Sequence, residues 1–115
     1  MSHRILSVSY DGGLLETREA ILRAAGYNVT SAEGFQAAIE ECHSGNFDLV
    51  IIGHSIPRRD KDAIIKAFRE HCKAPVISLL RVMEQPLPGT MSITPDPATL
   101  LKAVASVLSN RNPDY

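Results

Sequence analysis

FDLVIIGHSIP, residues 47–57, is the stretch that decides the fold of this chain. Its four consecutive apolar residues, Leu49–Ile52, lie between turn-prone neighbours, a pattern typical of a strand that is buried on both faces. In an open parallel sheet, ligands bind just beyond the carboxyl ends of such strands. Position 53 is therefore where a functional side chain would stand, and the chain has a glycine there.

On both sides of this stretch, short apolar runs alternate with amphipathic helical patterns. The remaining strands are predicted at residues 5–9, 27–31, 76–80 and 91–94. Helices are predicted at residues 14–25, 34–44, 60–72 and 97–108, the last with Asp96 as its cap and Pro97 as its first residue. This alternation predicts a doubly wound α/β fold, in which right-handed crossovers place helices on both faces of a five-stranded parallel sheet.

Helical spacing also predicts which side chains the helices bury. In the first helix the apolar periodicity includes one charged residue, Arg18. In the second and third helices the inner faces are expected to comprise Phe35, Ala38, Ile39 and Cys42, and Ile64, Ile65, Phe68 and Cys72. The outer face of the third helix is expected to carry Lys61, Lys66, Arg69 and Glu70.

Length and composition predict one domain over residues 1–115, with residues 110–115 as a frayed tail. A net charge of −1 and a hydrophobic content of 44% describe an ordinary globular chain, with no basic excess for nucleic acid and no apolar run for a membrane. The apolar run nearest the N-terminus, residues 5–9, is too short for a signal peptide. Two cysteines make no disulfide framework, so the expected compartment is the reducing cytoplasm.

Four segments together resemble the receiver domain of bacterial two-component response regulators, over residues 4–108. RILSVSYDGGLLETREAILRAAGYNV is similar to the first strand, first helix and second strand of that family, and FDLVIIGHSIP to its third strand and the following loop. APVISLL is similar to the fourth strand, and ITPDPATLLKAV to the fifth strand and last helix. The resemblance implies a flavodoxin-like fold with strand order 2-1-3-4-5.

The family's chemistry is the transfer of a phosphoryl group to an aspartate that ends the third strand, assisted by magnesium. Acidic residues after the first strand hold the metal, a Ser or Thr ends the fourth strand, and a Lys ends the fifth. Here the corresponding positions, which we call the degenerate phosphorylation pocket, are held by Ser9, Tyr10 and Asp11, by Gly53 and His54, by Leu80 and by Thr94. Ser78, two residues before Leu80, points to the same side of its strand.

These replacements remove the charged groups that the chemistry needs. Magnesium is usually held through carboxylates, so a site with Asp11 alone is expected to bind it weakly or not at all. Glycine at position 53 offers no nucleophile. The sequence therefore predicts a pseudo-receiver without catalytic residues, metal or other cofactor, and with a neutral pocket at the end of the third strand.

The link between the fourth and fifth strands is a second departure from the family, which has a full helix there. In RVMEQPLPGT, residues 81–90, the residues Pro86, Pro88 and Gly89 predict an irregular loop. A missing helix leaves one side of the sheet partly uncovered. Val82, Met83 and Leu87, or a partner, are expected to cover that side.

The expected function is phosphorylation-independent signalling in a two-component phosphorelay, by contact with another signalling protein or with a second copy of the chain. The expected contact residues are Arg81, Val82, Met83 and Leu87 of the loop, and Leu101, Lys102 and Ala105 of the last helix. Two alternatives remain open. One is a sensor of a small ligand or anion that uses the pocket around Gly53, with His54, Ser9 and Thr94. The other is a receiver phosphorylated at a non-standard carboxylate such as Asp11.

Two further constellations have simpler interpretations. Cys42-His43 and His71-Cys72 carry zinc-ligand residue types, but adjacent helical residues point about 100° apart, so we expect buried cysteines and exposed histidines. Arg58, Arg59 and Arg81 could bind an anion, although surface arginines are more commonly solvated. The sequence therefore predicts no metal site.

Overall fold

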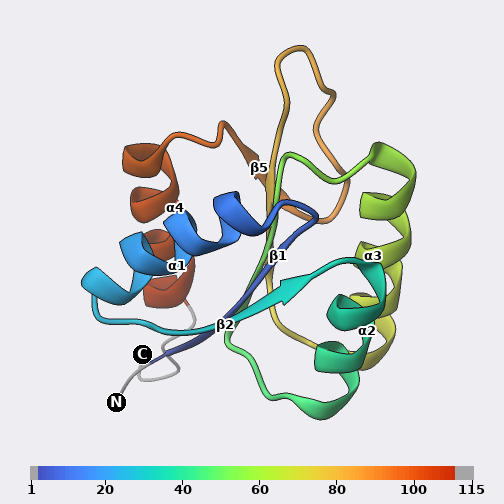
Figure 1. Ribbon diagram of the computed structural model, residues 1–115, viewed down its shortest axis with the longest axis horizontal. Helices are drawn as coiled ribbons and strands as arrows, with labels where there is room; N and C mark the ends of the chain where they lie inside the picture. The colour runs from blue at the N-terminus through green and yellow to red at the C-terminus, as the bar shows by residue number, and fades with distance from the viewer. Residues whose placement is uncertain (1–2, 111–115) are drawn as a thin grey trace.

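The computed structural model describes residues 3–110. Within them the strands β1 (Arg4–Ser9), β2 (Asn28–Glu33), β3 (Leu49–Ile52), β4 (Val76–Leu79) and β5 (Met91–Ile93) form one sheet in the order β2-β1-β3-β4-β5. All of its strand pairs are parallel. The helices are α1 (Gly12–Ala24), α2 (Phe35–Ser44), α3 (Arg58–His71) and α4 (Pro97–Asn110). The predicted flavodoxin-like, doubly wound sheet is confirmed (Figure 1).

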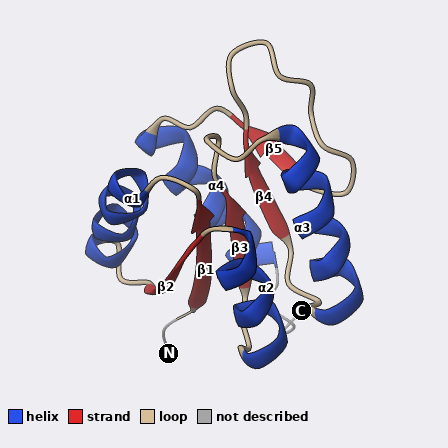
Figure 2. Ribbon diagram, turned by 45° about the vertical axis from the view of Figure 1, so that its right-hand side comes forward, coloured by secondary structure: helices blue, strands red, loops and turns tan. Residues whose placement is uncertain are grey.

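The helices form two layers, with α1 and α4 on one face of the sheet and α2 and α3 on the other (Figures 1 and 2). Successive residues of the strands point to opposite faces, so Ile5 packs in the cluster under α1 and α4, whereas Leu6 packs in the cluster under α2 and α3. Every residue of β3 is fully buried, as its apolar run predicts. This strand forms the centre of both cores.

Capping residues fix the helix ends that matter for the site. The Asp11 carboxylate accepts a hydrogen bond from the Leu14 backbone nitrogen at 3.0 Å and so caps α1. Asp96 Oδ2 likewise accepts a hydrogen bond from the Thr99 backbone nitrogen at 3.0 Å and caps α4, which begins at Pro97. Helix α4 continues to Asn110, and the rest of the predicted tail lies outside the described residues.

Two predicted surface assignments are wrong. Lys61, expected on the outer face of α3, is fully buried because its ammonium group finds two acceptors inside the protein, Leu79 O and Glu84. Phe35, expected on the inner face of α2, is 40% exposed, since it is the first residue of that helix and lies beyond the edge of the core.

Residues 80–90, all of them described, contain no helix and link β4 to β5 as an irregular loop, as predicted. In Figures 1 and 2 this loop extends beyond the carboxyl edge of the sheet. Of the three side chains expected to cover the sheet there, Leu87 does so, with 2% exposure. Val82 and Met83 are 94% and 92% exposed, so that expectation is wrong for them. In the turn that they occupy, Glu84 points inward to pair with Lys61.

None of the helices within residues 3–110 is long and apolar enough to cross a membrane.

Candidate functional site

The degenerate phosphorylation pocket lies at the carboxyl edge of the sheet, as predicted from the strand ends. Ser9 is the last residue of β1, Gly53 directly follows β3, and Leu80 directly follows β4. The parallel register places Val8 opposite Ile52, and the Gly53 backbone nitrogen donates a 2.8 Å hydrogen bond to the Val8 carbonyl oxygen. Gly53 is thus held tightly against β1.

The space beside Gly53 is already filled. A Cβ atom added at this glycine would lie 2.9 Å from the Val8 carbonyl oxygen and 3.3 Å from both terminal nitrogens of Arg18. Arg18 comes from the inner face of α1, is only 6% exposed, and donates a hydrogen bond to Ser7 Oγ at 3.2 Å. A guanidinium group therefore lies where a receiver carries the acceptor carboxylate.

Arg18 also corrects the expectation of a neutral pocket. Burial lowers the pKa of its guanidinium to about 10, which still leaves the group charged at neutral pH. The pocket is therefore cationic on the side of α1. The sequence contained a signal for this, because Arg18 is the one charged residue in the apolar periodicity of the first helix. Long side chains at such positions commonly reach solvent, however, and this one does not.

At the positions where the family holds magnesium, side chains bond to the protein itself. Ser9 Oγ lies 2.9 Å from Ser55 Oγ and accepts a hydrogen bond from the Asp11 backbone nitrogen at 3.1 Å. Tyr10 donates its hydroxyl to Asp60 Oδ2 at 2.8 Å, and burial together with this carboxylate raises the pKa of Tyr10 to about 12. These contacts tie the end of β1 to the loop after β3 and to α3.

His54 and Ser78 each have a buried atom with no hydrogen-bond partner among the described residues, His54 Nδ1 and Ser78 Oγ. Burial lowers the pKa of His54, and the charges of Arg18, Lys61 and Arg81 lower it further, against a smaller opposing effect of Asp11. The imidazole is therefore neutral at neutral pH. At the family's lysine position, Thr94 donates to Asp96 Oδ1 at 2.7 Å and so belongs to the cap of α4.

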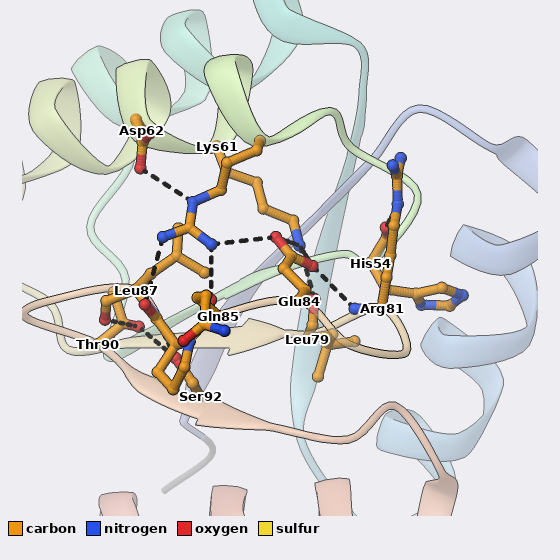
Figure 3. Close-up of polar contacts among 12 residues, drawn as sticks. His54, Lys61, Asp62, Leu79, Arg81, Glu84, Gln85, Leu87, Thr90 and Ser92 are labelled. Carbon is orange, nitrogen blue, oxygen red and sulfur yellow. Dashed lines mark hydrogen bonds and ion pairs between the residues drawn. The ribbon is translucent and has the colours of Figure 1, made fainter.

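A buried ion pair replaces the missing helix as the support of the loop (Figure 3). Lys61 Nζ donates to Glu84 Oε1 at 2.7 Å and Oε2 at 2.9 Å, and to the Leu79 carbonyl oxygen at 2.9 Å. Glu84 also accepts from the Arg81 backbone nitrogen at 2.8 Å. The sequence did not predict this pair, because lysine on a helix and glutamate in a loop are both ordinary surface residues.

The pKa values of this pair shift downward for different reasons. Burial lowers the pKa of Lys61, although the hydrogen bond and charge of Glu84 oppose that effect. For Glu84, burial acts to raise the pKa, but the hydrogen bonds from Arg81 and Lys61 and the charges of Lys61 and Arg58 outweigh it and lower the pKa. The carboxylate therefore stays ionised at neutral pH, where it can pair with Lys61.

Arginine side chains hold the rest of the loop by its backbone. Arg81 donates from Nε to His54 O at 2.7 Å and from a terminal nitrogen to Ser55 O at 2.8 Å. Arg58 donates to the Gln85 carbonyl oxygen at 2.6 Å. The interpretation of Arg58 and Arg81 as solvated surface residues is therefore incomplete, because both side chains donate to backbone carbonyl groups. Arg59 is exposed.

The residues expected to contact a partner lie in two places. On α4, Lys102 and Ala105 are exposed and Leu101 is half-buried. In the loop, Arg81, Val82 and Met83 are exposed, whereas Leu87 is buried in the core and is not available at the surface. Leu87 therefore anchors the loop to the core and is not a contact residue.

The cysteines and histidines lie at the opposite edge of the sheet. Cys42 is buried, Cys72 is half-buried, and both His43 and His71 are exposed. Among residues 3–110 there is no group of three or more His, Cys, Asp or Glu side chains that could hold a metal ion.

Comparison with known proteins shows the fold at low sequence identity. No family model matches the chain, and no curated protein matches it. Among solved structures, the receiver domain of the Francisella response regulator 1452 matches with a TM-score of 0.84 at 17% identity, over 96% of this chain and all of that one (100%). A putative response regulator from Chloroflexus aurantiacus matches with a TM-score of 0.82 at 24% identity, over 95% of this chain and 99% of that one.

A third solved structure, the receiver domain of the hybrid histidine kinase CckA, is 26% identical with a TM-score of 0.77, over 91% of this chain and 98% of that one. These domains are similar to this chain along almost their whole length. The chain therefore has the fold of CheY-like receiver domains.

Proposed function

We propose that this chain is a receiver-like module of two-component signalling that accepts no phosphoryl group and acts through protein–protein contact. The observation that carries the proposal is the filled space at Gly53. A receiver needs a carboxylate at this point, and here even a Cβ atom would lie 2.9 Å from the Val8 carbonyl oxygen and next to the Arg18 guanidinium. Gly53 itself offers no nucleophile, and a larger residue at this position would have to displace the Arg18 side chain from its present place.

The surroundings of Gly53 support the absence of metal chemistry in the same way. Asp11, the carboxylate nearest to the family's metal position, accepts the hydrogen bond that caps α1. Arg18 adds a fixed positive charge, which disfavours a divalent cation at the same edge. We therefore expect no magnesium or other cofactor and no catalytic residue in this chain.

The proposed contact surface is the loop of residues 81–90 together with the exposed side of α4. Val82 and Met83 project into solvent from a turn that is anchored to the protein by the Lys61–Glu84 ion pair and by buried Leu87. Because the backbone of the turn is already anchored, it loses little conformational entropy when these side chains bind a partner. We expect the partner to be another signalling protein or a second copy of this chain, with the cytoplasm as the compartment.

Incubation with acetyl phosphate and magnesium, followed by intact-mass analysis, tests the proposal. We expect no gain of phosphoryl mass. A gain that disappears in an Asp11→Asn variant would instead establish the alternative of a receiver phosphorylated at Asp11. The hydrogen bond that the Leu14 backbone nitrogen donates to Asp11 Oδ1 argues against that alternative, because it occupies this carboxylate as the cap of α1.

One observation favours the other alternative, a sensor of a small ligand or anion. The Arg18 guanidinium and the unpartnered His54 Nδ1 both lie at the carboxyl edge of the sheet. An anion that binds only the folded chain raises its melting temperature. A rise with inorganic phosphate that is lost in Arg18→Met would favour the sensor over the contact module.

A further inference from the structure

Cys42 and Cys72 bring two thiols together at the edge of the sheet opposite Gly53. Cys42 lies in the last turns of α2 and Cys72 directly follows α3. Their Sγ atoms are 2.9 Å apart, and Cys72 Sγ also donates to the Cys42 carbonyl oxygen at 2.9 Å. A disulfide bond is about 2.05 Å long, so the sulfur atoms need to approach by only about 0.9 Å.

The helix ends that carry these thiols are held side by side by independent contacts. The imidazole rings of His43 and His71, the sequence neighbours of the two cysteines, lie 4.4 Å apart between their centroids. Cys42 also packs in the same core cluster as Phe68 of α3. The proximity of the thiols thus belongs to the packing of α2 against α3.

The two thiols differ in their access to solvent. Cys42 is buried, and burial together with the hydrogen bond to Cys72 raises the pKa of the Cys42 thiol. Cys72 lines a cavity of about 540 Å³ together with Arg4, His71 and Lys73. Arg4 and Lys73 outnumber the one carboxylate of this cavity, Asp48, so the cavity favours the approach of anionic reagents. Cys72 is therefore the thiol that an incoming molecule reaches first.

We propose that Cys42 and Cys72 form a reversible dithiol–disulfide pair, with an anionic low-molecular-weight disulfide as the oxidant. The Cys72 thiolate attacks one sulfur of the small disulfide, which releases one small thiol and leaves a mixed disulfide on Cys72. Cys42, as its thiolate, then attacks Cys72 Sγ and releases the second small thiol. The protein loses two protons and two electrons, and the small disulfide is reduced to two thiols. This inference does not rest on the proposed signalling function.

The bond would join the carboxyl ends of α2 and α3 across a separation of 30 residues. A cross-link of that span constrains the unfolded chain, and the melting temperature is expected to rise by about 10 °C. Reduction of the bond would reverse the change.

The test treats the fully reduced chain with glutathione disulfide, alkylates the remaining thiols and measures intact mass. The expected product is a monomer that has lost two hydrogen atoms, takes up no alkyl group and melts at the higher temperature. Cys42→Ser is expected to retain one glutathionyl group on Cys72, and Cys72→Ser to stay unmodified at buried Cys42.

As a control, the chain unfolded in guanidinium chloride is treated with the same reagent. This control verifies that glutathione disulfide can oxidise both cysteines when they are accessible. The proposal is overturned if that control reacts while the native chain keeps both thiols. It is equally overturned if native Cys72 accumulates a stable glutathionyl group, or if disulfide-linked dimers form in place of the internal bond.

Discussion

Gly53 and Arg18 are the two residues whose placement decides the chemistry at the carboxyl edge of the sheet. The absence of a nucleophile at Gly53 could be predicted from the sequence, because the strand that precedes it is unmistakable. The guanidinium beside it could not, since helical spacing places Arg18 on the inner face of α1 but leaves the direction of its long side chain open. The residue types therefore predicted a neutral pocket, whereas in the structure the positively charged Arg18 guanidinium lies beside Gly53.

Gly53→Ala is expected to destabilise the fold by about 1–3 kcal/mol, because the added methyl group overpacks the space between Val8 O and Arg18. Gly13→Ala is the matched control. Gly13 lies in the first turn of α1, where an added Cβ would approach only a side-chain atom, Asp11 Oδ1 at 3.3 Å, so alanine there should cost less stability than alanine at position 53. Urea unfolding of both variants measures the difference; equal stabilities would show that Gly53 has room for a side chain.

His54 gives the expected pH dependence. Its pKa in the folded chain is lowered from 6.5, first by burial and then by Arg18, Lys61 and Arg81. Below pH 6.5 the unfolded chain therefore binds more protons than the folded chain, and the stability contribution of neutral His54 is lost as the pH falls. The free energy of unfolding should decline less steeply below this pH in His54→Asn than in the wild type. Parallel pH profiles would contradict the lowered pKa.

At the scale of elements, the loop of residues 81–90 takes the place of a helix between β4 and β5. Proline and glycine predicted its irregularity correctly. The sequence did not show what holds it, because the Lys61–Glu84 pair joins residues 23 positions apart and neither residue belongs to a recognisable motif. Such a pair becomes visible only when α3 and the loop are placed in space (Figure 3).

Glu84→Gln is expected to cost about 3 kcal/mol of folding stability, because it leaves the buried Lys61 ammonium group without its countercharge. Lys61→Met in the same chain should recover most of that loss, since the methionine removes the buried charge at similar volume. A double-mutant cycle by chemical unfolding measures the coupling energy. Additive effects of the two substitutions would show that the pair does not hold the loop.

Within the loop of residues 81–90, buried Leu87 is expected to stabilise the fold, whereas exposed Val82 and Met83 are expected to contact a partner. Leu87→Ala should cost about 2–4 kcal/mol, because Leu87 is buried in the core. Val82→Asp combined with Met83→Asp should change stability by no more than about 0.5 kcal/mol for each substitution, because both side chains are exposed. Thermal unfolding of the two variants checks this contrast, and a large loss in the aspartate variant would place Val82 or Met83 in the folded core.

At the scale of the whole molecule, the sheet and its two helical layers followed from short-range patterns. Alternation of strands and helices, a fully apolar central strand and right-handed crossovers leave few arrangements open, and the order β2-β1-β3-β4-β5 is the one that forms. What the patterns could not supply are contacts between distant segments: Arg18 beside Gly53, Lys61 with Glu84, and Cys42 beside Cys72. Each of these depends on side-chain directions that only the folded molecule sets.

At the same scale, the structure is compatible with the proposed loss of the receiver's chemistry from a preserved fold. The two cores are built from apolar faces of the strands and helices, and none of the positions of the degenerate phosphorylation pocket belongs to the fully apolar strand β3 itself. Residues at strand ends can therefore change while the sheet remains. The low identity to the matched receiver domains, 17% to the Francisella domain at a TM-score of 0.84, agrees with this separation of fold and site.

The most direct test of the central claim is the intact mass of the native chain after incubation with excess acetyl phosphate and magnesium. A receiver of known activity, treated in parallel, verifies the phosphodonor. We predict an unchanged mass for this chain, because Gly53 supplies no acceptor carboxylate and the nearby Asp11 carboxylate caps α1. A hydroxylamine-sensitive gain of one phosphoryl group, which marks an acyl phosphate on a carboxylate, would contradict the account.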